Sequence, residues 1–206
     1  MNHLRAYRAH RRKDLRFRIE SSLQLSLLIN LLYGAYKAVL AIWLHSSWAG
    51  ASAFYYAVLS IARHQLLRGI HLQSPARIRR KYHLCGWMLL LLTIPISAIG
   101  ARSIFRGESA HYPGHMIYAA ASYTFYSLTM AIIGLIRGRR LRSPIHIAAK
   151  ILTLANALTA IFSLQCAMIV RFGGNPQFQN TMNTITGLAV FISVAGMSAY
   201  MILDRR

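Results

Sequence analysis

The chain has 206 residues, of which 55% are hydrophobic and only 14% are charged, so it is too apolar for an ordinary soluble domain of this length. Its 24 Lys and Arg residues face four carboxylates, and the formal net charge is +20. Such a basic excess is typical of nucleic-acid binders, but here the basic residues form short clusters between apolar runs of about 20 residues, the length of a membrane-spanning helix. Composition therefore predicts an integral membrane protein and excludes a soluble nucleic-acid-binding protein.

Residues 1–21 form a basic N-terminal segment. Seven Lys and Arg residues lie between Met1 and Glu20. We expect either a helix on the membrane surface, which anionic headgroups of the cytoplasmic leaflet attract by about 1 kcal/mol per basic residue, or a solvated tail that directs insertion. The apolar run that follows is long enough to remain as a membrane span, so no cleavable signal peptide is expected.

Six membrane spans are predicted in one domain over residues 22–203, followed by a basic tail at residues 204–206. The spans lie near residues 22–44, 49–67, 84–101, 116–136, 148–170 and 182–203. Lys and Arg number seven in the N-terminal segment, five in the second connection, four in the fourth and two in the tail. The first connection has none, the third has two and the fifth has one. Because Lys and Arg mark the cytoplasmic side, this alternation predicts a six-transmembrane-helix bundle with both termini cytoplasmic, in an inner or plasma membrane.

The second and fourth connections resemble each other. LLRGIHLQSP ends at Pro75 and LIRGRRLRSP ends at Pro144, a spacing of 69 residues. In both segments Gly is suited to end a helix, Pro to begin the next one, and the cations to meet lipid headgroups. Either a duplicated pair of helical hairpins or convergence on a common cytoplasmic turn explains the similarity.

The apolar spans differ in their content of small residues. Gly, Ala and Ser recur in the second, fourth, fifth and sixth spans, and such residues let helices approach closely in lipid, so these spans are predicted to form the packed interior. The third span, with four consecutive leucines at residues 89–92, is predicted to face lipid. Cys85 and Cys166 fall in spans near opposite membrane faces and are expected to be buried thiols without a disulfide between them.

Two short stretches carry a family resemblance. The first two spans resemble the Asn…Lys…Gly-Ser segment of the cation diffusion facilitator family, whose spacing recurs here at Asn30, Lys37 and Ser47. The stretch SPIHIAAKILTLANALT (143–159) is similar to the Ser-Pro pattern of the same family. The resemblance implies a cation-efflux-like bundle of six helices with cytoplasmic ends. The chain is also similar to uncharacterised small bacterial six-helix membrane proteins that share YPG…IY…YTFY and SP…AAK patterns, here beginning at Tyr112 and Ser143.

The metal ligands that the resemblance implies are replaced in this chain. They fall on Tyr56 and Ser60 in the second span, and on Leu152 and Asn156 in the fifth. Because a divalent ion needs carboxylates or imidazoles in place of its hydration shell, we expect no metal site and no cofactor. An active divalent-cation exporter is kept as the alternative.

Groups that could carry out catalysis are missing from the predicted spans. All four carboxylates, Asp14, Glu20, Glu108 and Asp204, lie outside them, which removes intramembrane proton relays and acid/base pairs. No nucleophile–base set or phosphate-binding Gly-rich loop is present either, so we expect a protein without enzymatic activity. His45, His111 and His115 are interpreted as surface residues.

Basic residues inside the spans need a separate explanation. Lys37 could extend outward to the interface or point inward as a charge that attracts anions, and we favour the outward direction because no acidic partner exists at that depth. Arg63, His64 and Lys150 lie near the predicted cytoplasmic ends of their spans and are expected to contact headgroups.

Neutral polar residues provide the candidate functional site. Polar groups that face lipid tails are costly, so we expect these side chains to face protein, where they either line a pathway or only join helices by hydrogen bonds. The candidate pathway residues are Asn30, Lys37, Tyr56, Ser60, Tyr126 and Asn156. Such a pathway would suit a small neutral or anionic solute.

These observations lead to one functional hypothesis. We expect a cation-efflux-like scaffold without its metal site that moves an unknown solute or acts as an accessory subunit. A purely structural membrane partner is the further alternative, and a homodimer is an option for either function.

Overall fold

The computed structural model describes the backbone of residues 2–43, 45, 47–70, 74–106, 116–138, 144–172 and 175–204, and its description of side chains begins at Ser21. Every element in these ranges is an α-helix, and no strand occurs in them. The helices are α1 (Asn2–Trp43), α2 (Ser47–Ile70), α3 (Pro75–Leu91), α4 (Thr93–Arg106), α5 (Met116–Gly138), α6 (Pro144–Phe172) and α7 (Pro176–Leu203). The predicted all-α class is therefore confirmed.

Three helical segments within the described ranges are long and apolar enough to cross a membrane. They are Leu23–Trp43 in α1, Pro144–Phe172, which is the whole of α6, and Gln177–Leu203 in α7. These segments coincide with the first, fifth and sixth predicted spans, and a shorter apolar segment, Thr124–Ile136, lies within the fourth. Length and composition therefore agree with a protein embedded in a membrane.

The third predicted span is divided between two helices. The helix breaks at Leu92, but the amide of Leu92 still donates to the Met88 carbonyl at 3.0 Å, and that of Ile96 donates to the Leu92 carbonyl at 3.3 Å. Pro95 has no amide hydrogen and its ring crowds the carbonyl four residues earlier, at Leu91, so the regular ladder is interrupted there. We therefore describe α3 and α4 together as one composite helix with a proline break.

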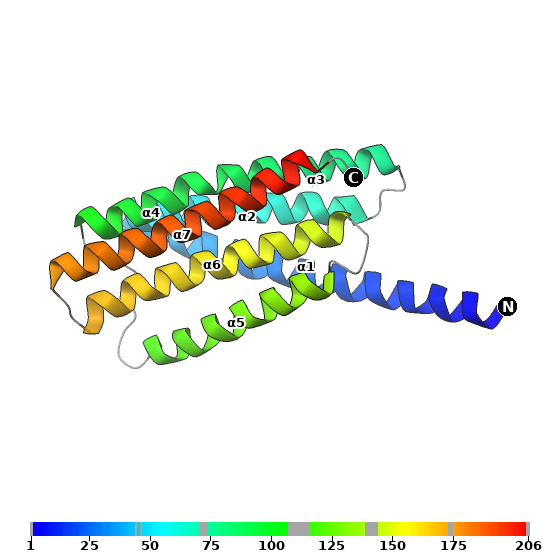
Figure 1. The fold of residues 1–206 in the computed structure, drawn as a ribbon, viewed down its shortest axis with the longest axis horizontal. Coiled ribbons are helices and arrows are strands. Elements are labelled where there is room, and N and C mark those ends of the chain that lie inside the picture. The colour runs from blue at the N-terminus through cyan, green and yellow to red at the C-terminus, as the bar shows by residue number, and fades with distance from the viewer. Residues whose placement is uncertain are drawn as a thin grey trace.

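The helices run side by side along one axis of the molecule (Figure 1). The N-terminus and the C-terminus lie at the same end, and the N-terminal part of α1 extends past the bundle at that end (Figure 1). Because α1 is continuous from Asn2 to Trp43, the basic segment and the first predicted span belong to one helix.

The central helices differ from those predicted. The composite α3–α4 helix touches α2 and α7, and its α3 part also touches α6. In contrast, α5 packs chiefly on α6, and α1 packs chiefly on α2. The expectation that the third span faces lipid while the fourth is interior is therefore wrong. The composite α3–α4 helix is central in the bundle, and α5 lies at its edge.

The leucine run shows why the third span is central. Leu89 and Leu92 are fully buried, whereas Leu90 and Leu91 are exposed, since four consecutive residues point around the whole circumference of a helix. The core face of α3–α4 repeats every three or four residues and consists of Tyr82, Cys85, Leu89, Leu92 and Ile96.

The position of α5 follows from a narrow buried stripe. Ile117, Thr124 and Ala131 are buried and lie seven residues apart, which suits contact with a single neighbouring helix. The small residues of the fourth span therefore do not indicate an interior helix. Both Cys85 and Cys166 are buried free thiols, as predicted.

Some sequence predictions fall beyond the part of the chain that the structure describes. They concern His111, His115, the Tyr112–Gly114 motif, the side chain of Tyr123 and the tail residues Arg205 and Arg206.

Candidate functional site

The α1–α2 hairpin sets the register of the candidate site. A Cβ atom placed on Gly34 would lie 3.1 Å from the Cβ of Tyr56, and one placed on Gly50 would lie 3.9 Å from the Cβ of Ala41. The two helices are antiparallel and closely packed, and the missing side chain of Gly34 allows this approach. Asn30 precedes Gly34 by four residues, and Ser60 follows Tyr56 by four residues. Because the two helices are antiparallel, Asn30 and Ser60 lie at the same level of the hairpin.

Three buried polar side chains occur at and next to this level. Asn30 is 5% exposed, Ser60 is 6% exposed and Arg63 is 2% exposed. The Nδ2 atom of Asn30, the Oγ atom of Ser60 and the Nε atom of Arg63 have no hydrogen-bond partner among the described residues. Because most buried polar atoms in proteins are paired, three unpaired ones in a single hairpin mark it as a candidate site.

The burial of Arg63 corrects its predicted role. A side chain that is almost completely enclosed does not contact headgroups, whereas its neighbour His64 is exposed, as that prediction requires. Arg63 follows Ser60 by three residues on α2 and therefore shares its face.

Lys37 is buried as well, with 8% of its surface exposed. Its Nζ atom lies 5.4 Å from the centre of the Tyr33 ring, a distance typical of a cation–π contact. The inward direction therefore replaces the outward one that the sequence favoured. Leu23, Asn30 and Lys37 are buried at intervals of seven residues, so they form the face of α1 that meets α2.

Aromatic rings connect α1 to α2. The ring of Tyr33 packs edge-on against Tyr56 with centroids 4.8 Å apart, and Tyr56 packs edge-on against Tyr55 at 5.2 Å. Both contacts have the edge-to-face geometry that aromatic pairs prefer.

Tyr55 extends the site to α6. Its hydroxyl donates to the Oδ1 atom of Asn156 at 3.5 Å, which joins α2 to α6. We define the polar cluster as the set of residues on α1, α2 and α6 that these contacts and the hairpin register bring together. Its members are Asn30, Tyr33, Lys37, Tyr55, Tyr56, Ser60, Arg63 and Asn156.

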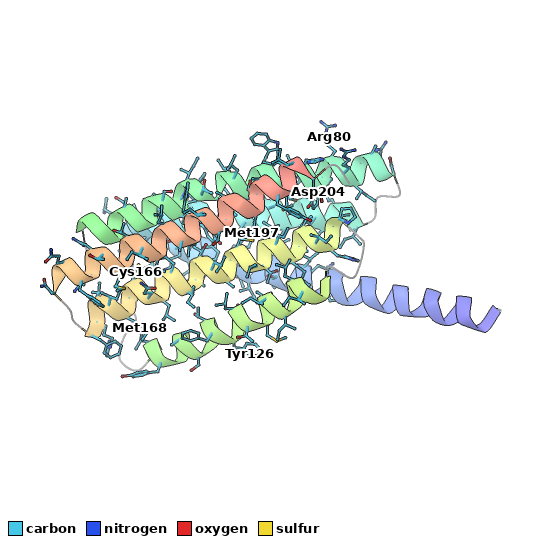
Figure 2. All side chains as sticks on the ribbon, in the orientation of Figure 1. Arg80, Tyr126, Cys166, Met168, Met197 and Asp204 are labelled. Carbon is cyan, nitrogen blue, oxygen red and sulfur yellow. The ribbon has the colours of Figure 1, made fainter. Side chains whose placement is uncertain are left out.

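The sixth candidate residue of the sequence analysis lies elsewhere. Tyr126 is 64% exposed on α5, which packs chiefly on α6 at the edge of the bundle (Figure 2). Gln165, another polar residue in a span, donates to the Met182 carbonyl at 3.3 Å and to Thr186 Oγ1 at 2.8 Å, so it joins α6 to α7. The structure thus brings five of the six candidates together and separates Tyr126 from them.

The charge of the polar cluster is positive. It holds Lys37 and Arg63 but no carboxylate, and the one carboxylate whose side chain the structure describes, Asp204, accepts a 3.5 Å hydrogen bond from Tyr82 at the C-terminal end of α7 (Figure 2). Hydroxyl, amide and guanidinium groups supply hydrogen-bond donors, which suit an anion or a neutral polar solute. Among the described residues, no group of three His, Cys, Asp or Glu side chains could hold a metal ion.

Sequence reasoning left Tyr33 out of the site and gave Arg63 another role. Tyr33 could have been found, because it lies three residues after Asn30 and four before Lys37, and therefore on the same helix face. Arg63 similarly follows Ser60 by three residues. The expectation that Arg63 contacts headgroups is based on its short distance from the end of the span. It does not consider the helix face that Arg63 shares with Ser60.

Comparison of the chain with protein-family models, curated proteins and solved structures finds no match in any of the three. The cation-efflux resemblance therefore stays a prediction.

Proposed function

We propose that the protein is a six-pass integral membrane protein of an inner or plasma membrane, with both termini in the cytoplasm. The shared end of the two termini supports this layout, as does the reading of α3 and α4 as a single pass. The sequence clusters of Lys and Arg lie in the N-terminal part of α1, at the α2–α3 connection and at the α5–α6 connection. Positive charge at these connections favours a cytoplasmic location for that end.

We further propose that the polar cluster binds and passes a small anionic or neutral solute, on a cation-efflux-like scaffold that has lost its metal ligands. The observation that carries this proposal is the burial of Arg63 and Lys37 together with hydrogen-bond donors and without a carboxylate in the cluster. Intramembrane cations are costly and mark ion or substrate pathways when they face the protein interior. Anions on this pathway would offset the cost of burying the two charges.

The positions that replace the metal ligands support an anion better than a metal. Tyr56, Ser60 and Asn156 offer neutral hydroxyl and amide groups, and none of them supplies the negative charge that a divalent ion requires. The nearby positive charges would also repel a cation. Active export of a divalent cation is therefore the weaker candidate.

Reconstitution into lipid vesicles tests the proposal. Vesicles that contain the full chain and a potassium salt gradient should develop the membrane potential of an anion-selective pathway, and neutral polyols should be tested in parallel by vesicle swelling. Arg63→Gln should remove the anion selectivity, whereas Arg68→Gln, which removes an exposed charge from the same helix, should retain it. If neither anions nor neutral solutes cross faster than in empty vesicles, the transport proposal fails.

An accessory role is the second candidate function. The faces of α1 and α5 away from the bundle carry large exposed apolar side chains, among them Leu32, Val39 and Ile136, which suit lipid or another membrane protein. Purification in mild detergent distinguishes these alternatives. A second protein in fixed stoichiometry would support the accessory role, and a chain that remains alone and conducts solute would contradict it.

A further inference from the structure

We propose that Asn30, Ser60 and Arg63 form a binding site for a phosphate group, carried either by inorganic phosphate or by an anionic phospholipid of the cytoplasmic leaflet. This inference rests on the proposed function, because it takes the polar cluster as an anion site, and it names the chemical class that the site binds.

The geometry brings three donors to one region of the α1–α2 hairpin. Ser60 and Arg63 share a face of α2, and the close pair of Gly34 and Tyr56 places Asn30 opposite Ser60 on α1. Long side chains on a helix lean toward its N-terminus, so the guanidinium of Arg63 is expected to extend back toward the level of Ser60. An amide, a hydroxyl and a guanidinium therefore converge from two helices.

The unpaired atoms match the hydrogen-bonding needs of a phosphate. Asn30 Nδ2 and Arg63 Nε are donors, and Ser60 Oγ carries a hydroxyl hydrogen, while none of the three has a partner among the described residues. A phosphate has several acceptor oxygens with negative charge, and guanidinium binds two of them with parallel hydrogen bonds. One phosphate group could thus satisfy all three atoms and balance the charge of Arg63.

The location suits a ligand that arrives from the cytoplasmic side. Arg63 precedes the end of α2 at Ile70 by seven residues, a rise of about 10 Å, which is shallow compared with the thickness of a bilayer. The basic residues Arg77, Arg79 and Arg80 lie at the connection between α2 and α3 and would raise the local concentration of anions. The helix α1 is at the edge of the bundle, since it packs chiefly on α2, so a lipid phosphate could enter beside α1 without displacing other helices.

Thermal unfolding of the purified full chain in detergent tests this site at constant ionic strength with gluconate as the reference anion. One arm is titrated with inorganic phosphate, and the other with dioctanoyl phosphatidylglycerol against dioctanoylglycerol, which has the same chains but no phosphate. We expect a saturable rise of the unfolding midpoint in at least one arm. A rise with inorganic phosphate identifies a free oxyanion as a ligand, and a rise with the phospholipid alone identifies a headgroup.

The variants assign the effect to the three residues. Arg63→Gln should raise the dissociation constant about 10- to 100-fold, the loss expected for hydrogen bonds to a charged group. Ser60→Ala and Asn30→Leu should weaken binding several-fold while leaving the unfolding midpoint without ligand unchanged or higher, and these two variants decide the test if Arg63→Gln fails to fold. Arg68→Gln is the matched control and should bind within about twofold of the unaltered chain.

The proposal is overturned if neither arm shows a saturable rise, or if Ser60→Ala, Asn30→Leu and a folded Arg63→Gln bind as tightly as the Arg68→Gln control. The vesicle assay separates this failure from that of the proposed function. Anion selectivity that depends on Arg63 without phosphate binding would refute the phosphate site and leave the anion pathway standing.

Discussion

Ser198 donates a hydrogen bond of 2.9 Å from its Oγ atom to the carbonyl oxygen of Gly86, which joins α7 to α3 inside the bundle. Gly86 is essential to this contact, because a Cβ atom there would lie 3.0 Å from Ile202 Cγ1 and 3.1 Å from Met201 Cβ. The hydroxyl and the missing side chain together let the two backbones approach. Small residues have the same effect wherever helices meet in lipid.

Gly86→Ala should therefore destabilise the protein. The added methyl group has no free space, and overpacking of this kind costs about 1–3 kcal/mol of unfolding free energy. Gly196→Ala is the matched control, because a Cβ atom at Gly196 meets nothing within 4 Å, and Ala stabilises a helix relative to Gly by about 0.5–1 kcal/mol. Reversible unfolding in mixed micelles measures both values, and equal effects of the two substitutions would contradict the close approach of α3 and α7.

Removal of the polar groups at Asn30 and Ser60 should not destabilise the ligand-free protein. A buried polar atom without a partner costs about 1–3 kcal/mol, so Asn30→Leu and Ser60→Ala should leave the unfolding free energy unchanged or higher. Ser198→Ala is the comparison, since it deletes a paired hydroxyl and should lower the unfolding free energy by about 0.5–1.5 kcal/mol. A loss at Ser60 as large as that at Ser198 would mean that Ser60 has a structural hydrogen bond.

The proposed orientation predicts which positions can be labelled from each side of the membrane. In a chain with Cys85 and Cys166 replaced by Ala, His45→Cys and Ser74→Cys each add one thiol at an exposed position, between α1 and α2 or immediately before α3. A membrane-impermeant maleimide applied to intact cells should react at position 45 and not at position 74. Reaction at position 74 alone would reverse the orientation, and reaction at both would indicate an even number of crossings between them.

The two natural cysteines should be unreactive in the folded protein. Both side chains are buried, and the thiol of Cys85 lies 3.8 Å from the Ala62 carbonyl oxygen, to which it donates. In mild detergent, a maleimide should therefore label both cysteines much more slowly than it labels an exposed thiol. After denaturation it should label both. His45→Cys provides the fast reference rate, and rapid labelling of Cys85 under native conditions would show that the α2–α3 interface opens.

Several parts of the candidate site could be read from the amino-acid sequence. Asn30, Ser60 and Asn156 are polar residues in apolar runs, and the high cost of exposing them to lipid predicts correctly that they turn toward other helices. Tyr126 shows the limit of this reasoning. Its hydroxyl belongs to the same residue class, but α5 lies at the edge of the bundle and presents Tyr126 outward (Figure 2).

The directions of the charged side chains were harder to derive. Lys37 and Arg63 have flexible stems that could reach an interface or fold inward, and sequence position does not distinguish these outcomes. The packing of α1 on α2 decides it, because the shared face encloses both residues.

The sequence alone determined that the chain is helical and apolar enough for a membrane, since these properties depend on local composition and on the length of uninterrupted apolar runs. Only the tertiary structure decided which helices are central and which polar residues meet. Both depend on contacts between segments far apart in the chain, such as Tyr55 with Asn156 and Ser198 with Gly86, and the periodicity of one helix does not specify its neighbours.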